Sequence, residues 1–256
     1  MTFSAAFSPC PNDIFLFRSF LEKHKGFPVF HQIMISDIAS LNHYALEANF
    51  SLVKISASLY PLIADSYDIL NVGTTLGYEM GPLVLSKQLD KPLHNLATPG
   101  TTTTAHALCR LFYPEAKLIP MKYHKIIPAI LANQVDGGVV IHEERFSFPK
   151  ELRIVGDLGH LWTEKWHLPL PLGCIAISKN IPSDDVYSLN YALQRSLRRS
   201  LTESSLATQK ASEYSRDKSL QTIQHFINTY VTEETFNLSP KGKQALSMLW
   251  TACRDA

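Results

Sequence analysis

The sequence predicts an α/β protein of two lobes with a helical tail. Short apolar runs alternate with amphipathic stretches through the first part of the chain, and the same alternation begins again near residue 93. The last third shows helical periodicity instead. Alternation of strands with helices is typical of βαβ units, in which helices cover a mainly parallel sheet. Two such units and a helical tail therefore predict two lobes.

The first unit shows apolar residues at strand and helix spacing in turn. In residues 13–22, for example, Ile14, Phe17 and Leu21 fall on one helical face. Strands are predicted at residues 2–7, 29–36, 51–56, 68–72 and 83–86, and helices at residues 13–22 and 38–48.

The second unit repeats the pattern, and the tail is helical. Strands are predicted at residues 93–98, 117–120, 137–141 and 151–156, and helices at residues 103–112 and 124–133. In the tail, Ser183 is expected to cap a long helix, and Ser239 with Pro240 is expected to open the last one.

One lobe is predicted to be formed by two separate segments of the chain and the other by a single segment. Residues 1–87 and 175–256 are assigned to lobe 1, and residues 88–174 to lobe 2. Residues 168–173 alternate leucine with proline, Leu-Pro-Leu-Pro-Leu-Gly, which favours a stiff, extended returning segment.

Composition limits the classes of function. The chain has 256 residues, 45% of them hydrophobic, and its 24 basic and 23 acidic side chains nearly cancel. No basic field is present to bind nucleic acid. The four cysteines form no C-x-x-C pair and the ten histidines have no metal-ligand spacing, so no metal is expected. Residues 1–7 carry no basic side chain, so we expect neither a secretory signal nor a membrane span, and a cytoplasmic protein.

Ligands of α/β sheets bind beyond the carboxyl ends of the strands, so the residues after each strand are the candidates. Lys54 and Ser56 end the third strand two residues apart and therefore point to the same side. An ammonium and a hydroxyl placed in this way can bind a carboxylate. A solvated lysine beside a turn serine is an equal alternative.

A second candidate is the threonine-rich segment at residues 98–105, Thr-Pro-Gly-Thr-Thr-Thr-Thr-Ala, which leads from a strand into a helix. The amides and hydroxyls of a helix N-terminus bind anions without any net positive charge. We expect Thr103 and Thr104 to bind a carboxylate or phosphate, with simple threonine capping as the alternative. The segment lacks the lysine of a nucleotide-binding P-loop.

A third candidate is His142, which follows the buried run at residues 137–141. An imidazole at the end of a buried strand is placed to act as a general base near neutral pH. A histidine satisfied inside a polar loop is the alternative. Either Glu143 or Glu144 is expected to orient the ring. Near the first helix, Cys10 is a weaker candidate for a nucleophile.

Taken together, these segments resemble the 1,4-dihydroxy-6-naphthoate synthase family. The opening Ser-Pro-Cys-Pro-Asn-Asp at residues 8–13 is similar to the family's first motif. Further similar segments occur in the same order at residues 41–47, 54–56, 81–83, 99–105, 141–146, 157–159, 168–173 and 229–231. The resemblance covers almost the whole chain, and the ordered set is specific although no single motif is.

The resemblance implies a fold similar to type II periplasmic binding proteins, with the ligand in a cleft between two lobes. It implies a lyase without a cofactor that splits cyclic dehypoxanthinyl futalosine into 1,4-dihydroxy-6-naphthoate and dihydroxyacetone on the futalosine route to menaquinone. It further implies His142 as the proton acceptor and two substrate-binding segments, Lys54-Ile55-Ser56 and Thr103-Thr104-Ala105. The implied substrate is a small carboxylated molecule, and homo-oligomerisation stays open.

The chain departs from the family pattern at Tyr78, His124 and Thr232. Two alternatives stay open: chorismate dehydratase of the same pathway, and a cytoplasmic solute-binding protein without catalysis. One architecture hosts many functions, so the fold alone does not separate them.

Overall fold

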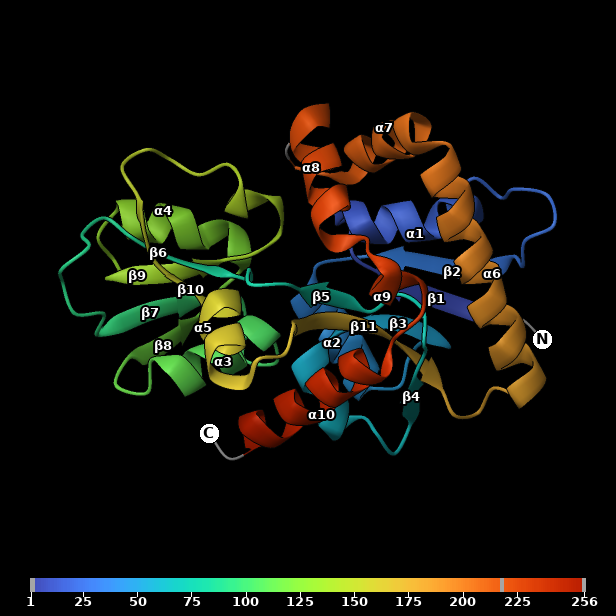
Figure 1. Cartoon of the computed structure of the whole chain (residues 1–256), viewed down its shortest axis with the longest axis horizontal. Helices are drawn as coiled ribbons and strands as arrows, with labels where there is room; N and C mark the ends of the chain where they lie inside the picture. The colour runs from blue at the N-terminus through green and yellow to red at the C-terminus, as the bar shows by residue number, and fades with distance from the viewer. Residues whose placement is uncertain (1–2, 217–218, 255–256) are drawn as a thin grey trace.

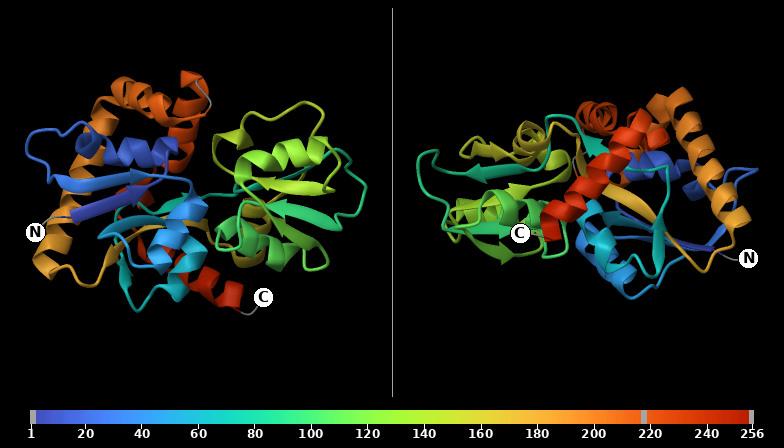
Figure 2. Two further views of the ribbon diagram at one scale, coloured as in Figure 1. Left: turned by 180° about the vertical axis from the view of Figure 1, so that it is seen from behind. Right: turned by 60° about the horizontal axis from the view of Figure 1, so that its bottom comes forward.

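A computed structural model describes residues 3–216 and 219–254 and has two β-sheets, one in each of two lobes that lie side by side (Figure 1). Helices lie on the faces of both sheets, as the two rotated views show (Figure 2). The predicted two-lobed α/β fold is therefore confirmed. No helix within the described residues is long and apolar enough to cross a membrane.

The sheet of lobe 1 has the order β2-β1-β3-β11-β4, and β5 pairs with β11. The first three strands are parallel, whereas β11 runs antiparallel to β3, β4 and β5. Its strands are β1 (Phe3–Phe7), β2 (Phe30–Ile35), β3 (Leu52–Ser56), β4 (Tyr67–Ile69), β5 (Thr75–Gly77) and β11 (Leu170–Ser178).

Two apolar cores flank this sheet because side chains alternate along each strand. Ala5 and Phe7 pack under α1, α6, α7 and α8, while Ala6 packs on the opposite side with α2 and η1. The helices of lobe 1 are α1 (Pro11–Leu21), α2 (Ile38–Leu46), η1 (Ala57–Leu62), α6 (Ser183–Thr202), α7 (Ser204–Tyr214), α8 (Leu220–Tyr230), α9 (Glu233–Phe236) and α10 (Pro240–Arg254).

The sheet of lobe 2 has the order β10-β6-β9-β7-β8 and also separates two cores. Val139 faces α3 and α5, and its neighbour Val140 faces α4. The elements are β6 (Leu83–Ser86), β7 (Asn95–Thr98), α3 (Thr104–Phe112), β8 (Lys117–Pro120), η2 (Tyr123–Lys125), α4 (Ile126–Leu131), β9 (Gly137–Val140), η3 (His142–Arg145), β10 (Arg153–Asp157) and α5 (Leu158–Trp166).

Both sheets are mixed, so the expectation of a mainly parallel sheet is wrong. Two strands run against all the others of their sheets: β6, on which the chain enters lobe 2, and β11, on which it returns to lobe 1. A strand that enters a lobe from the other one arrives from the opposite direction. The crossings also come earlier than expected, since β6 already belongs to lobe 2 and β11 already to lobe 1 from Leu170 onward.

Several local predictions change in detail. Pro182 caps α6 and Ser183 is the first helical residue, so Ser183 is not the cap. Helix α5 was not predicted, although Asp157 caps it by accepting from the amides of Gly159 and His160. The predicted strand start at Thr2 lies outside the described residues.

The crossing segments touch where both carry glycine. A Cβ placed on Gly81, between β5 and β6, would lie 2.7 Å from the amide nitrogen of Gly159 at the start of α5. No real side chain tolerates that distance, so glycine permits this close approach. Helix α10 adds a second connection, because it packs against η1 of lobe 1 and α3 of lobe 2 (Figure 1).

Candidate active site

A cavity opens between the two lobes, with about 730 Å³ of space including the part open to solvent. Lobe 1 contributes Ser8, Cys10, Asn12, Asp13, Lys54, Ser56, Thr75, Phe226 and Tyr230 to its walls. Lobe 2 contributes Thr103, Thr104, Ala105, Ile141, His142 and Arg145.

His142 stands just beyond the end of β9, where the sequence places a general base. Its backbone has a φ of 62°, the left-handed region that residues other than glycine rarely adopt. Backbone strain of this kind is kept where the surroundings hold a side chain in one direction. The edge of the ring packs on Tyr123, with centroids 5.2 Å apart.

Cys10 meets His142 across the cleft. It is the N-cap residue of α1, and Pro11 follows at the first helical position, where its fixed φ suits a helix start. The Sγ of Cys10 contacts the Nδ1 of His142 in a hydrogen-bonding arrangement. Lobe 1 thus contacts the imidazole that lobe 2 carries.

Of the two glutamates predicted to orient His142, the structure describes the side chain of Glu144 only. Glu144 faces Arg216, with 3.8 Å between Oε1 and Nη1. The side chain of Glu143 lies outside the described part of the structure. Which of the two orients the imidazole therefore stays a prediction.

Lys54 lines the cavity but already has partners for its ammonium. Its Nζ lies 2.9 Å from Asp13 Oδ1, 3.0 Å from the carbonyl oxygen of Gly73 and 3.1 Å from Thr75 Oγ1. An ammonium has three donors, so all are used. A substrate carboxylate would compete with Asp13 for this charge.

Asp13 holds this end of the cavity together. Its carboxylate accepts from Ser8 Oγ at 2.6 Å and from Asn12 Nδ2 at 3.1 Å, besides the ion pair with Lys54. Cys10 occupies the cap of α1, and Asp13 lies in the first turn. A carboxylate in that turn still suits the helix dipole.

The N-terminus of α3 presents backbone amides rather than hydroxyls. Thr103 Oγ1 donates to the carbonyl oxygen of Gly100 and accepts from the amide of His106. Thr104 Oγ1 donates to the carbonyl oxygen of Leu172 and accepts from the amide of Ser58. Both hydroxyls are therefore occupied, as the capping alternative implies for Thr103.

The amides at the same helix end are in a different position. Within residues 3–216 and 219–254, the backbone N–H groups of Thr104 and Ala105 have no acceptor. Both residues line the cavity. Amides at a helix N-terminus that point at a cavity form an anion site.

Ser56 faces these amides from lobe 1, and Ile55 does not. Ser56 Oγ accepts from Asn42 Nδ2 at 3.0 Å, which leaves its own hydroxyl hydrogen to donate. Asn42 Nδ2 also donates to the carbonyl oxygen of Thr102 and so ties Ser56 to the segment before α3. Ile55 is fully buried on the opposite face of β3, where it packs with Leu41. Its side chain does not line the cavity.

The fold also brings Arg145, Phe226 and Tyr230 to the cavity, and no role was predicted for them from the sequence. Arg145 pairs with Asp157 Oδ2 at 2.8 Å and donates to the carbonyl oxygen of Gly81. Phe226 and Tyr230 lie one turn apart on α8, so their helical spacing marks them as one face but not as cavity wall.

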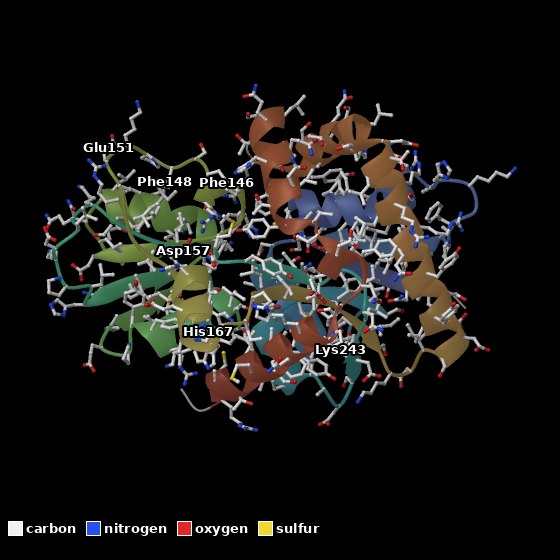
Figure 3. All side chains as sticks on the ribbon, in the orientation of Figure 1. Phe146, Phe148, Glu151, Asp157, His167 and Lys243 are labelled. Atoms are coloured by element: carbon white, nitrogen blue, oxygen red, sulfur yellow. The ribbon has the colours of Figure 1, made fainter. Side chains whose placement is uncertain are left out.

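The loop after His142 packs against α8. Phe146 contacts the rings of His225 and Phe226 at 4.5 and 6.2 Å between centroids. Figure 3 shows Phe146 on the side of lobe 2 that faces α8. No group of three histidine, cysteine, aspartate or glutamate side chains within the described residues is arranged to hold a metal ion.

A family model described as "Menaquinone biosynthesis" matches residues 3–255 of the chain. The chain belongs to this menaquinone-biosynthesis family. Among proteins of known role, a 1,4-dihydroxy-6-naphthoate synthase of Thermus thermophilus is 32% identical over 247 residues, which are 95% of this chain and 91% of the relative. The synthase of the same name from Streptomyces coelicolor is 30% identical, covering 98% and 92%.

Solved structures share the fold of this menaquinone-biosynthesis protein. Protein AF1704 of Archaeoglobus fulgidus is 29% identical and superposes with a TM-score of 0.95 over 99% of this chain and 97% of its own. The aliphatic sulphonate binding protein SsuA of Escherichia coli is only 7% identical, but has a TM-score of 0.70 over 99% and 85%. The fold is thus that of periplasmic binding proteins.

Proposed function

We propose that this protein is a 1,4-dihydroxy-6-naphthoate synthase, a lyase of menaquinone biosynthesis. It splits cyclic dehypoxanthinyl futalosine into 1,4-dihydroxy-6-naphthoate and dihydroxyacetone without a cofactor. The observation that carries the proposal is the cavity between the lobes, where His142 and the open amides of α3 lie on the walls of one small-molecule site. The names of the two relatives support the same reaction.

The ring carboxylate of the substrate binds at the N-terminus of α3 in this proposal. The amides of Thr104 and Ala105 donate to it from lobe 2, and the hydroxyl of Ser56 donates from lobe 1. An anion held from both sides favours the closed arrangement of the lobes. Closure excludes water and aligns the substrate with the base.

His142 acts as the base that removes a proton next to a carbonyl. Elimination and ring opening then lead to an aromatic naphthalenediol. A positioned general base contributes about 10²–10⁴-fold to the rate. The strained backbone at His142 and the contact with Cys10 both serve to hold the imidazole in one direction.

The two alternatives are not favoured. The similar proteins of known role carry the name of the naphthoate synthase and not of chorismate dehydratase. A binding protein without catalysis needs no imidazole held at the wall of its cavity. The likeness to SsuA concerns the fold.

We further propose a cytoplasmic location, where disulfides are rare and cysteine side chains stay reduced. Within the part of the chain that the structure describes, no disulfide joins any of the cysteines, Cys10, Cys109, Cys174 and Cys253. Small carboxylated molecules are the partners that the cavity supports.

The test is incubation of the purified protein with cyclic dehypoxanthinyl futalosine, followed by mass spectrometry. The wild type and a His160→Ala variant should form 1,4-dihydroxy-6-naphthoate at equal rates, because His160 is exposed and outside the cavity. His142→Ala should lose about 10²–10⁴-fold in kcat while its circular dichroism spectrum stays the same.

The possible results separate the hypotheses. Unchanged substrate with the wild type would refute the synthase, and conversion of chorismate in its place would support the dehydratase. Product from a folded His142→Ala variant at the normal rate would leave the reaction in place and remove His142 from it.

A further inference from the structure

The phenol of Tyr230 is an unexplained polar group in the cavity wall. Tyr230 ends α8 and is only 4% exposed, yet it lines the cavity beside Phe226. Within residues 3–216 and 219–254, its Oη has no hydrogen-bond partner. The Oη is not among the fully enclosed polar atoms that lack a partner, so it opens onto the cavity and is available to donate to a ligand atom there.

Two charged groups are close enough to act on this phenol. Burial raises the pKa of Tyr230 to about 12, while the guanidinium of Arg145 lowers it and the carboxylate of Asp157 raises it. Arg145 and Asp157 pair with each other at 2.8 Å, so their charges largely cancel at the hydroxyl. The phenol therefore stays protonated near neutral pH and acts as a donor, not as a base.

We propose that Tyr230 is a catalytic residue that donates a hydrogen bond to the substrate oxygen that becomes negative when His142 removes a proton. The inference rests on the proposed synthase reaction. A C–H bond next to the carbonyl breaks, the proton goes to His142, and the electron pair moves to form an enolate. The negative charge then lies on the carbonyl oxygen, and Tyr230 donates to it without transferring its own proton.

The position of Tyr230 suits this task. His142 and Arg145 belong to one short turn of lobe 2, and the Tyr230 phenol lies within reach of the charge on Arg145. Base and donor thus come from opposite lobes and face one cavity. A neutral donor in a water-poor site stabilises an oxyanion more in the transition state than a carbonyl in the ground state.

The test is Tyr230→Phe, which removes one hydroxyl and keeps the ring. We expect kcat with cyclic dehypoxanthinyl futalosine to fall about 10²–10³-fold, the usual effect of losing one oxyanion donor, while KM changes by less than about threefold. Its Tm should not fall, because the hydroxyl has no partner to lose. Tyr67→Phe is the matched control. Tyr67 is fully buried, is not part of the cavity lining and donates to the carbonyl oxygen of Phe50, so the Tm of this variant should fall while kcat holds.

Each outcome has one meaning. A wild type that converts the substrate, with Tyr230→Phe converting it at the same kcat, overturns the role of Tyr230 and leaves the synthase intact. A tenfold or larger rise in KM at constant kcat also overturns it, because it assigns Tyr230 to ground-state binding alone. If the wild type does not convert the substrate, the synthase proposal fails and this inference falls with it.

Discussion

The Sγ of Cys10 in lobe 1 contacts the Nδ1 of His142 in lobe 2, although the two residues are 132 positions apart in the chain. The base of the proposed reaction is thus oriented by the opposite lobe. Opening of the cleft would break this contact. The correct orientation of His142 is therefore coupled to closure over the substrate.

Replacement of Cys10 tests this coupling. Cys10→Ala should lower kcat roughly tenfold, about the value of one hydrogen bond, and change the pH profile of kcat, because the imidazole loses a partner. Steady-state kinetics across pH measures both effects. Cys253→Ala, outside the cavity, should leave the profile as it is. An unaltered profile in Cys10→Ala would mean that the contact does not serve the base.

Ser56 tests the anion site at the N-terminus of α3. Ser56→Ala should raise KM about three- to tenfold with kcat retained, because one hydrogen bond to the bound carboxylate is lost. The exposed Ser247→Ala on α10 serves as the control and should change neither constant. A lower kcat at constant KM would contradict a pure binding role.

The preference of the same site for a carboxylate is tested with two aromatic ligands that differ in charge. 2-Naphthoate should bind the wild type about tenfold more tightly than 2-naphthamide, since helix N-terminal amides favour a charged acceptor. Isothermal titration calorimetry measures both affinities. Equal binding of acid and amide would show that no carboxylate site exists there.

Lys54 and Asp13 form a buried ion pair, and the loss of one partner alone should lower the free energy of unfolding. Lys54→Met leaves an uncompensated carboxylate in a site where both side chains are almost fully buried, and should lower the free energy of unfolding by about 3–5 kcal/mol. The double variant Lys54→Met/Asp13→Asn should recover about half of that loss, because the lone charge is gone. Urea unfolding of the wild type, Lys54→Met, Asp13→Asn and the double variant measures the coupling of the two groups. Additive losses would show that the two groups do not interact.

Glu22 should make stability depend on acid pH. Burial acts to raise the pKa of Glu22, but hydrogen bonds from Arg199 and Arg18 outweigh it and hold the pKa below its ordinary value of 4.5. A lowered folded-state pKa means that the ionised form contributes stability above the unfolded-state pKa and loses it as pH falls through the folded-state pKa.

Glu22→Gln should therefore cost about 1 kcal/mol of unfolding free energy at pH 7 and progressively less below about pH 4. Chemical denaturation at a series of pH values measures the difference between the two proteins. Glu47→Gln, an exposed carboxylate at the end of α2, is the control. A constant difference across the series would exclude ionisation of Glu22 as the cause.

Much of the fold was predictable because strands and helices follow local periodicity. β6 and β8 have the predicted limits, and α1, α2 and α3 lie within about two residues of theirs. Helix α5 was missed although Leu158, Leu161, Trp162 and Trp166 lie at helical spacing. Strand direction was misjudged because periodicity is the same in parallel and antiparallel strands.

For the site, the sequence by itself determined which chemical groups stand at the ends of strands: His142 after β9, Ser56 at the end of β3, and the helix start after β7. These placements depend on short-range geometry, which neighbouring residues dictate. The tertiary structure alone decided which of them meet. The contact of Cys10 with His142, the pairing of Lys54 with Asp13 and the entry of Tyr230 into the cavity all join distant segments, and their geometry depends on sheet order and on the packing of one lobe against the other.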